Sequence, residues 1–307
     1  MVEDKKNIIK NNSKMFLAIK LKNKYNSLKT FLKLLFTNKL TGFAFIVISA
    51  LIIIAIFASI LAPYPEQGLG KVNLDEVFQS PNAKHIFGTD ELGRDIFSRL
   101  LYGARISLSI SVITIVIALI IAIPLGLISG YYGGFVDEII MRITDVFLSF
   151  PPLLIAIVIT SFLGPSLRNA VIAIAIAWWP SYARLIRAQV ISVKQKPFIS
   201  ASKCIGTSDF KIMLTHILPN SIAPIIIQAS MDMGSVILTA ASLSFIGLGA
   251  QAPEPEWGLI ISTSRKFIMD AWWYTVFPGL VIFITVLSFN LLGDGLREVL
   301  DPKTRVR

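Results

Sequence analysis

Residues 197–220, PFISASKCIGTSDFKIMLTHILPN, form the long polar interruption inside an otherwise apolar sequence, and the rest of the chain is arranged around them. Apolar residues recur at helical spacing before Gly206 and again after Asp209. Glycine has no Cβ and can adopt the left-handed backbone conformation that ends a helix. The stretch therefore predicts an elbow made of two short helices that meet at Gly206.

Two features set the limits of this elbow. The polar run 207–209 offers side-chain oxygens that could cap the second helix. Pro219 lacks a backbone N–H, so we expect the second helix to stop there and the elbow to stand apart from the next apolar segment. Lys203 and Lys211 make one side basic, while the other side is apolar. This pattern is typical of a segment that binds a partner protein. The alternative is an amphipathic loop that lies on the membrane surface.

Composition indicates a membrane protein. The chain has 307 residues, of which 54% are hydrophobic and 16% charged, and its mean hydropathy is +0.69. Several apolar runs are long enough to cross a bilayer. A signal peptide is not expected at the first run, because the polar lead is too long and the apolar segment exceeds the usual length. We predict an all-α, polytopic membrane protein.

The sequence offers little for metal, redox or catalytic chemistry. Cys204 is the single cysteine, and the two histidines, His85 and His216, are far apart, so neither a disulfide nor a zinc site is expected. No G-x-x-x-x-G-K-[ST] phosphate-binding loop occurs in the sequence, and no catalytic triad or carboxylate pair is placed for a reaction. We predict that the chain is not an enzyme, needs no cofactor, and depends on other subunits if ATP is used.

Charge sets the expected topology. Residues 1–40 hold ten lysines against two acidic residues, a net charge of +8, which predicts a cytoplasmic tail near anionic lipid. Nucleic-acid binding is disfavoured, because the tail has few aromatic residues and precedes a membrane span. The segment 184–211 holds six Lys or Arg and one acidic residue, whereas 249–270 holds two basic and three acidic residues, so the elbow is expected inside the cell.

Six membrane spans fit these charges, with both termini in the cytoplasm. We expect spans at about 43–61, 106–128, 137–163, 170–179, 222–248 and 275–292. The predicted division of the chain is a basic tail (1–40), a first transmembrane helix (41–62), an external loop (63–104), a five-helix core (105–295) and a cytoplasmic C-terminal tail (296–307). In the external loop, an N-cap signal before Asp95 and the Asp95–Arg99 spacing predict a short interfacial helix.

Three residues within the expected spans are unsuited to lipid. Pro151 and Pro152 must bend or interrupt the third span. A carboxylate at the centre of a span, as at Asp232, costs about 2.5–3.5 kcal/mol on insertion scales. All three are candidates for the wall of a translocation path. A packing kink is the alternative for the prolines, and helix packing or proton coupling is the alternative for Asp232.

The elbow resembles the cytoplasmic coupling motif of ATP-binding cassette (ABC) importer permeases, which begins with Glu-Ala-Ala, continues through a glycine and ends in Leu-Pro. Ser200 stands where the family usually has Glu, and Ser202 where it has the second Ala. The resemblance implies that this segment docks on an ATPase. The residues that it marks for ATPase coupling are Ala201, Gly206, Asp209, Ile217, Leu218 and Pro219.

Further segments resemble the C-type permease subunit of oligopeptide and dipeptide importers, in the same order along the chain. They are GTDELGRDIFSRLLYGARISL (88–108), GGFVDEIIMRITDVFLSFPP (133–152), LSFIGLGAQAPEPEWG (243–258), FPGL (277–280) and FNLLGDGLREVLDP (289–302). The resemblance implies a type I ABC importer transmembrane domain in a bacterial cytoplasmic membrane. Its implied partners are a second permease subunit in a heterodimer, two cytoplasmic ATPase subunits and an extracytoplasmic substrate-binding protein.

The implied mechanism is that ATPase closure on ATP rocks the spans between inward-facing and outward-facing arrangements. The identity of the transported solute stays open, because relatives with the same sequence motifs carry nickel and other small solutes as well as peptides. Two other classes also stay open: an independent proton-coupled transporter that uses Asp232, and an integral membrane enzyme or scaffold.

Overall fold

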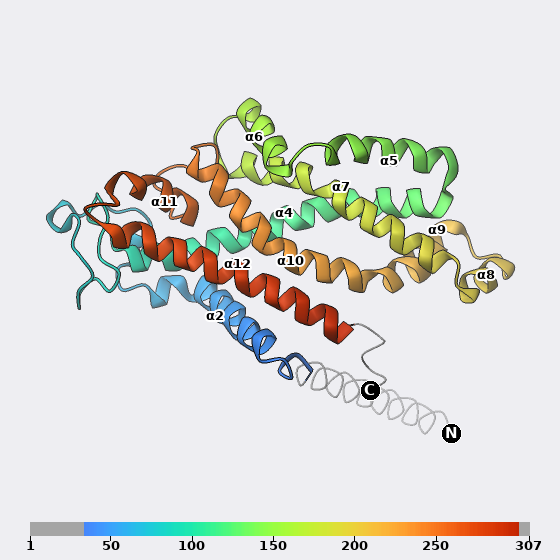
Figure 1. Cartoon of the computed structure of the whole chain (residues 1–307), viewed down its shortest axis with the longest axis horizontal. Helices are drawn as coiled ribbons and strands as arrows, with labels where there is room; N and C mark the ends of the chain where they lie inside the picture. Colours follow the sequence, from blue (N-terminus) through green and yellow to red (C-terminus); the bar gives the residue numbers. More distant parts are fainter. Residues whose placement is uncertain (1–33, 301–307) are drawn as a thin grey trace, which may run out of the picture.

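The computed structural model describes residues 34–300, which form a bundle of long helices (Figure 1). Most of the lysine-rich tail and the last seven residues, for which we predicted cytoplasmic positions, lie outside this described part. The long helices are α2 (Lys39–Leu61), α4 (Ile96–Tyr132), α5 (Gly134–Leu148), α6 (Pro152–Leu163), α7 (Leu167–Lys194), α10 (Leu218–Phe245) and α12 (Trp272–Leu300).

Short helices mark the two ends of the bundle. At one end lie α8 (Pro197–Cys204) and α9 (Asp209–Ile212), and we call this the elbow end (Figure 1). At the opposite end lie residues 62–95, which include α3 (Pro65–Gly68), together with α11 (Trp257–Ser264), and we call this the cap end (Figure 1). The predicted elbow is therefore separated from the cap by the full length of the long helices.

By length and composition, the structure supports four of the six predicted membrane spans, and a fifth if α5 and α6 form one bent span. Four helices are long and apolar enough to cross a bilayer: α2, α4, the continuous helix 209–245, and α12. The helices α5 and α6 meet this criterion together, and they are bent by 86° at a short break. This bend confirms the interruption predicted at Pro151 and Pro152. A crossing by α7, the less apolar helix of 28 residues, stays a prediction.

The predicted interfacial helix near Asp95 is wrong as a separate element. Helix α4 begins at Ile96 and runs unbroken to Tyr132, so Arg99 belongs to its first turn. Asp95 is its N-cap and accepts a hydrogen bond from the backbone N–H of Ser98 at 2.7 Å. Because this cap lies directly before a long apolar run, the short segment and the second span fuse into one helix.

Buried polar contacts hold the cap end together. The His85 side chain is fully buried, with Nδ1 2.8 Å from Asp95 Oδ1 and Nε2 3.2 Å from Glu76 Oε2. The Arg94 Nε donates to Asp90 Oδ2 at 2.7 Å. Burial raises the pKa of the Asp90 carboxyl, although the neighbouring arginines oppose this change. Residues 62–95 are therefore a folded platform on the helix ends.

Two glycines let α4 and α7 pack closely. A Cβ at Gly126 would lie 2.7 Å from the Ile186 Cβ, and a Cβ at Gly130 would lie 2.7 Å from the Val190 Cβ. Both distances are shorter than real Cβ contacts allow. The spacing of four residues puts the glycines on one face of α4, as in other close helix pairs of membrane proteins.

We expect Gly130→Ala to destabilise the chain by about 1–3 kcal/mol, because the added methyl group overpacks the α4–α7 contact. Thermal unfolding in detergent measures this effect. Gly279→Ala is the matched control, since a Cβ at this position on α12 meets nothing within 4 Å. Alanine favours a helix over glycine by about 1 kcal/mol, so the control is expected to be neutral or stabilising. Equal stability of the two variants would contradict the packing role of Gly130.

Candidate functional site: the elbow and the polar face of α10

The elbow has the predicted break at Gly206. Helix α8 ends at Cys204, Gly206 has a φ of +79°, and α9 begins at Asp209. A positive φ of this size suits glycine and strains other residues. Nothing lies within 4 Å of the position that a Cβ would occupy, so the backbone conformation alone requires glycine here.

The expectation that Pro219 separates the elbow from the next span is wrong. Helix α9 continues through a π-helical turn (Met213–Ile217) directly into α10, and residues 209–245 form one continuous helix. The π turn changes the hydrogen-bond spacing just before Pro219, which then lies in the first turn of α10, where its missing N–H is tolerated. The second half of the elbow is thus a continuous extension of α10.

The polar run after Gly206 does not cap α9 as predicted. Ser208 is at the N-cap position, but its side chain makes no capping hydrogen bond. Asp209 instead accepts a hydrogen bond from the hydroxyl of Tyr131, at the far end of α4. No local sequence pattern predicts this contact, because the two residues are 78 positions apart.

Tyr131 is one of the residues that join the elbow to the bundle. Its side chain is buried, and the ammonium groups of Lys194 and Lys203 lie 5.3 and 5.0 Å from its ring centroid. Lys194, at the end of α7, also donates to the Tyr131 carbonyl oxygen. One aromatic side chain therefore links α4, α7, α8 and α9.

Ion pairs brace the same end of the bundle. Arg187 on α7 donates from Nε and from a terminal nitrogen to the two carboxylate oxygens of Asp137 on α5, each at 2.5 Å. Asp137 also accepts a hydrogen bond from Ser129 Oγ on α4 at 2.5 Å. Arg184, one turn before Arg187 on α7, pairs with Asp145 of α5. These contacts fix α5 against α4 and α7 beside the elbow.

The elbow presents an apolar surface to its surroundings. Ile205 and Phe210, on either side of Gly206, are 83% and 68% exposed. Together with the exposed Phe198 and Leu214 they form what we call the elbow surface. The opposite side, with Ile199, Ile212, Met213 and Ile217, is buried against the bundle. Large apolar side chains that gather on an exposed projection are typical of a binding surface.

The residues marked for ATPase coupling divide between these two sides. Ala201, Gly206, Asp209 and Pro219 are exposed, whereas Ile217 is fully buried and Leu218 is half-buried. Ile217 therefore packs the elbow onto the bundle and is shielded from any partner. The sequence pattern did not separate the outer from the inner residues of this segment, and their role in ATPase coupling stays a prediction.

Helix α10 carries a polar face along its length. Gln228, Asp232, Ser235, Thr239 and Ser242 follow one another at spacings of three and four residues, which places them on one side of the helix. None of the five is buried, and Ser235 is exposed. On α2, by contrast, the exposed side chains are mostly large and apolar: isoleucines, phenylalanines and leucines. We call these five residues the polar face of α10.

Asp232 has neighbours that the sequence did not reveal. Gln228 Nε2 donates to Asp232 Oδ1 at 3.1 Å. The fully buried Tyr182 of α7 lies close enough for its hydroxyl to interact with this carboxylate, although it makes no hydrogen bond of standard geometry. Pro151 and Pro152 lie elsewhere, at the exposed break between α5 and α6, so the structure does not place them on the polar face of α10.

Two protein families match the chain. Residues 122–306 match the family described as binding-protein-dependent transport system inner membrane component, and residues 27–81 match the N-terminal TM domain of oligopeptide transport permease C. The dipeptide transport system permease protein DppC of Alkalihalophilus pseudofirmus is 50% identical over 268 residues, which cover 87% of each chain. The probable D,D-dipeptide transport system permease protein DdpC of Escherichia coli K12 is 43% identical, with 87% of this chain and 88% of that protein covered.

Other comparisons agree. The glutathione transport system permease protein GsiD of Pectobacterium atrosepticum is 45% identical over 83% of this chain and 84% of its own length. A solved structure of the inward-facing MetNI methionine ABC transporter has a chain that matches with a TM-score of 0.56 and 17% identity, over 67% of this chain and 98% of that chain, which shows a shared fold. This chain belongs to the family of binding-protein-dependent transport system inner membrane components and is a multi-pass ABC importer permease.

Proposed function

We propose that the chain is one of two permease subunits in a bacterial importer that carries dipeptides or oligopeptides into the cell. A second permease, two cytoplasmic ATPases and an external binding protein would complete the importer. The named relatives transport a dipeptide, a D,D-dipeptide or glutathione, and all three are short peptides. A short peptide is therefore the solute that we propose here.

The exposed elbow surface is the observation that carries this proposal. It lies at the elbow end, where six Lys or Arg residues between 184 and 211 favour the cytoplasmic side. An ATPase that covers Ile205 and Phe210 would bury apolar area that is otherwise exposed, which stabilises the contact by about 25 cal/mol per Å². Because α9 continues into α10, a displacement of the elbow would move a whole membrane helix.

We further propose that the polar face of α10 lines the translocation path. A carboxylate in contact with lipid is costly, so we expect Asp232, which already contacts Gln228, to face water, another subunit or polar groups of its own chain. The remaining members of the face are hydroxyl and amide side chains that can hydrogen-bond to a peptide backbone. Asp232 would attract the ammonium group of a passing peptide.

Reconstituted vesicles test the proposal. The chain is purified together with the second permease and the ATPases, and uptake of a labelled dipeptide is measured with saturating binding protein. We expect uptake that requires ATP and persists when the proton gradient is collapsed. If this chain alone took up the peptide, and collapse of the proton gradient abolished that uptake, the result would instead support a proton-coupled transporter. Nickel uptake without peptide uptake in the same vesicles would overturn the proposed solute.

Tyr131→Phe is expected to lower the number of peptides moved per ATP several-fold. The variant removes only the hydroxyl that binds Asp209, a charge-assisted hydrogen bond worth about 1.5–3 kcal/mol. Because Asp209 is exposed, water can replace the lost donor and the chain stays folded. ATP hydrolysis should continue, but the contact that connects the elbow to α4 is weakened. Tyr132→Phe, at the exposed neighbouring tyrosine, is the control, and an unchanged transport-to-ATP ratio in Tyr131→Phe would contradict the role of this contact.

A further inference from the structure

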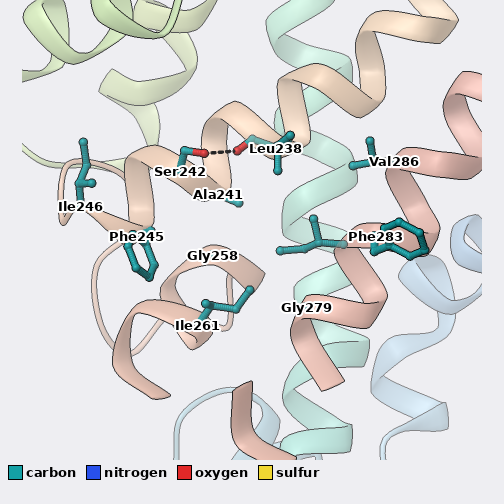
Figure 2. Close-up of a pocket in the computed structure, with 11 residues that line it drawn as sticks. Leu238, Ala241, Ser242, Phe245, Ile246, Gly258, Ile261, Gly279, Phe283 and Val286 are labelled. Atoms are coloured by element: carbon teal, nitrogen blue, oxygen red, sulfur yellow. Dashed lines mark hydrogen bonds between the residues drawn. The ribbon is translucent and has the colours of Figure 1, made fainter. Parts of the chain in front are cut away.

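A cavity of about 470 Å³ lies beside the polar face of α10, between α10, α11 and α12 (Figure 2). Its size falls in the range of small-molecule sites. The lining is almost wholly apolar, and its larger members include Leu238, Phe245, Ile261, Ile282, Phe283 and Val286. Ser242, whose Oγ donates to the Leu238 carbonyl oxygen at 2.8 Å, contributes the polar edge (Figure 2).

Two glycines in the lining have opposite roles. A Cβ at Gly258 would lie 2.3 Å from the Ala241 Cα, so this glycine allows α11 to pack directly on α10 and close one side of the cavity. A Cβ at Gly279 on α12 would meet nothing within 4 Å. No packing contact therefore demands glycine at 279, and its effect is to leave the cavity open.

The surroundings of the cavity indicate its occupant. Ser242 is the last member of the polar face of α10 and also lines the cavity, so the cavity continues the proposed path at the cap end. The guanidinium carbon of Arg265 lies 5.0 Å from the Phe245 ring centroid, which puts a cation beside the apolar lining. Within residues 34–300 this exposed arginine forms no ion pair. An apolar pocket with an available cation nearby complements an apolar side chain next to a carboxylate.

We propose that this cavity receives the apolar C-terminal side chain of a transported peptide, with the peptide carboxylate held at Arg265. The inference rests on the proposed function and adds a preference among peptides. The site would be occupied transiently, as the peptide enters the path from the cap end. A lipid chain or an apolar side chain of the second permease would fill the same space without using the cation, and the test distinguishes these occupants.

The test compares Ala-Phe with Ala-Ala uptake in the reconstituted complex with binding protein. Gly279→Leu fills the cavity, and we expect it to lower Ala-Phe uptake at least fivefold relative to Ala-Ala, whose smaller side chain does not need the space. Gly279→Ala adds one methyl group, should lower the same ratio less, and keeps the test valid if the leucine variant is unstable. Arg265→Gln is expected to lower uptake of Ala-Phe but not of its C-terminal amide.

The outcomes separate the inference from the proposed function. Equal loss of both peptides in Gly279→Leu would overturn the inference in favour of subunit packing, and unchanged uptake of both would overturn it in favour of lipid or empty space. An Arg265→Gln variant that treats the acid and the amide alike would overturn the carboxylate contact. Absence of ATP-dependent uptake of either peptide by the unmodified complex would instead contradict the proposed function itself.

Discussion

Replacing Gly206 with valine is expected to reduce ATP-dependent uptake about tenfold or more while the chain remains folded in the membrane. The φ of +79° at this position costs a non-glycine residue about 1–2 kcal/mol, and a β-branched side chain more. A change of about 1.4 kcal/mol shifts an equilibrium tenfold. Because nothing crowds the Cβ position, the elbow can relieve the strain by changing its angle, which would displace the elbow surface from an ATPase.

Gly164→Val is the matched control for this experiment. Gly164 has a φ of +89°, its Cβ position is equally open, and it ends α6 away from the elbow. The valine therefore also introduces backbone strain, at a φ of 89° and ψ of 155° that are essentially restricted to glycine, without touching the proposed coupling surface. We expect this control to keep uptake within twofold of the unmodified complex. Normal uptake in Gly206→Val, or an equal loss in both variants, would contradict the coupling role of the elbow.

Asp232→Asn is expected to lower peptide uptake about tenfold with ATP hydrolysis retained. The substitution keeps the shape of the side chain and its ability to accept from Gln228, but it removes the negative charge. A hydrogen bond to a charged group is worth about 1.5–3 kcal/mol, enough to account for this loss if the carboxylate binds the peptide ammonium. Initial rates of dipeptide uptake, measured beside ATP hydrolysis in the same vesicles, check the prediction.

Asp294→Asn provides the control for the charge change. Asp294 is an exposed acid on α12, off the polar face of α10, and its replacement should leave uptake unchanged. An equal loss of uptake in the Asp232→Asn and Asp294→Asn variants would indicate a general effect of net charge. Uptake that survives Asp232→Asn would remove Asp232 from the path and leave it a packing role.

The sequence predicted features that depend on neighbouring residues. The helix break at Gly206 follows from one residue and its conformational freedom, and the bend between α5 and α6 follows from two consecutive prolines. The spacing of its five residues would also allow the polar face of α10 to be predicted. Only Asp232 was predicted as a path residue, because a charged side chain in a membrane span is a stronger signal than hydroxyl groups.

Features that depend on distant residues were missed. The contact between Tyr131 and Asp209 joins positions 78 apart, and no local pattern encodes it. The π turn before Pro219 was missed for a related reason, since the rule that proline ends a helix assumes regular α-helical hydrogen bonds on both sides. The separate helix near Asp95 was wrong because a good N-cap does not say how far the helix extends.

If an ATPase binds the elbow on the cytoplasmic side, as we propose, Cys204 allows a direct test. It is the single cysteine of the sequence, it is exposed, and it lies beside Ile205 on the elbow. A photoreactive maleimide is attached to Cys204 in the assembled complex and activated by light. We expect the ATPase subunit to be the cross-linked protein, and we expect a membrane-impermeant maleimide not to reach Cys204 from outside intact cells. Labelling from outside, or cross-linking without any ATPase product, would contradict it.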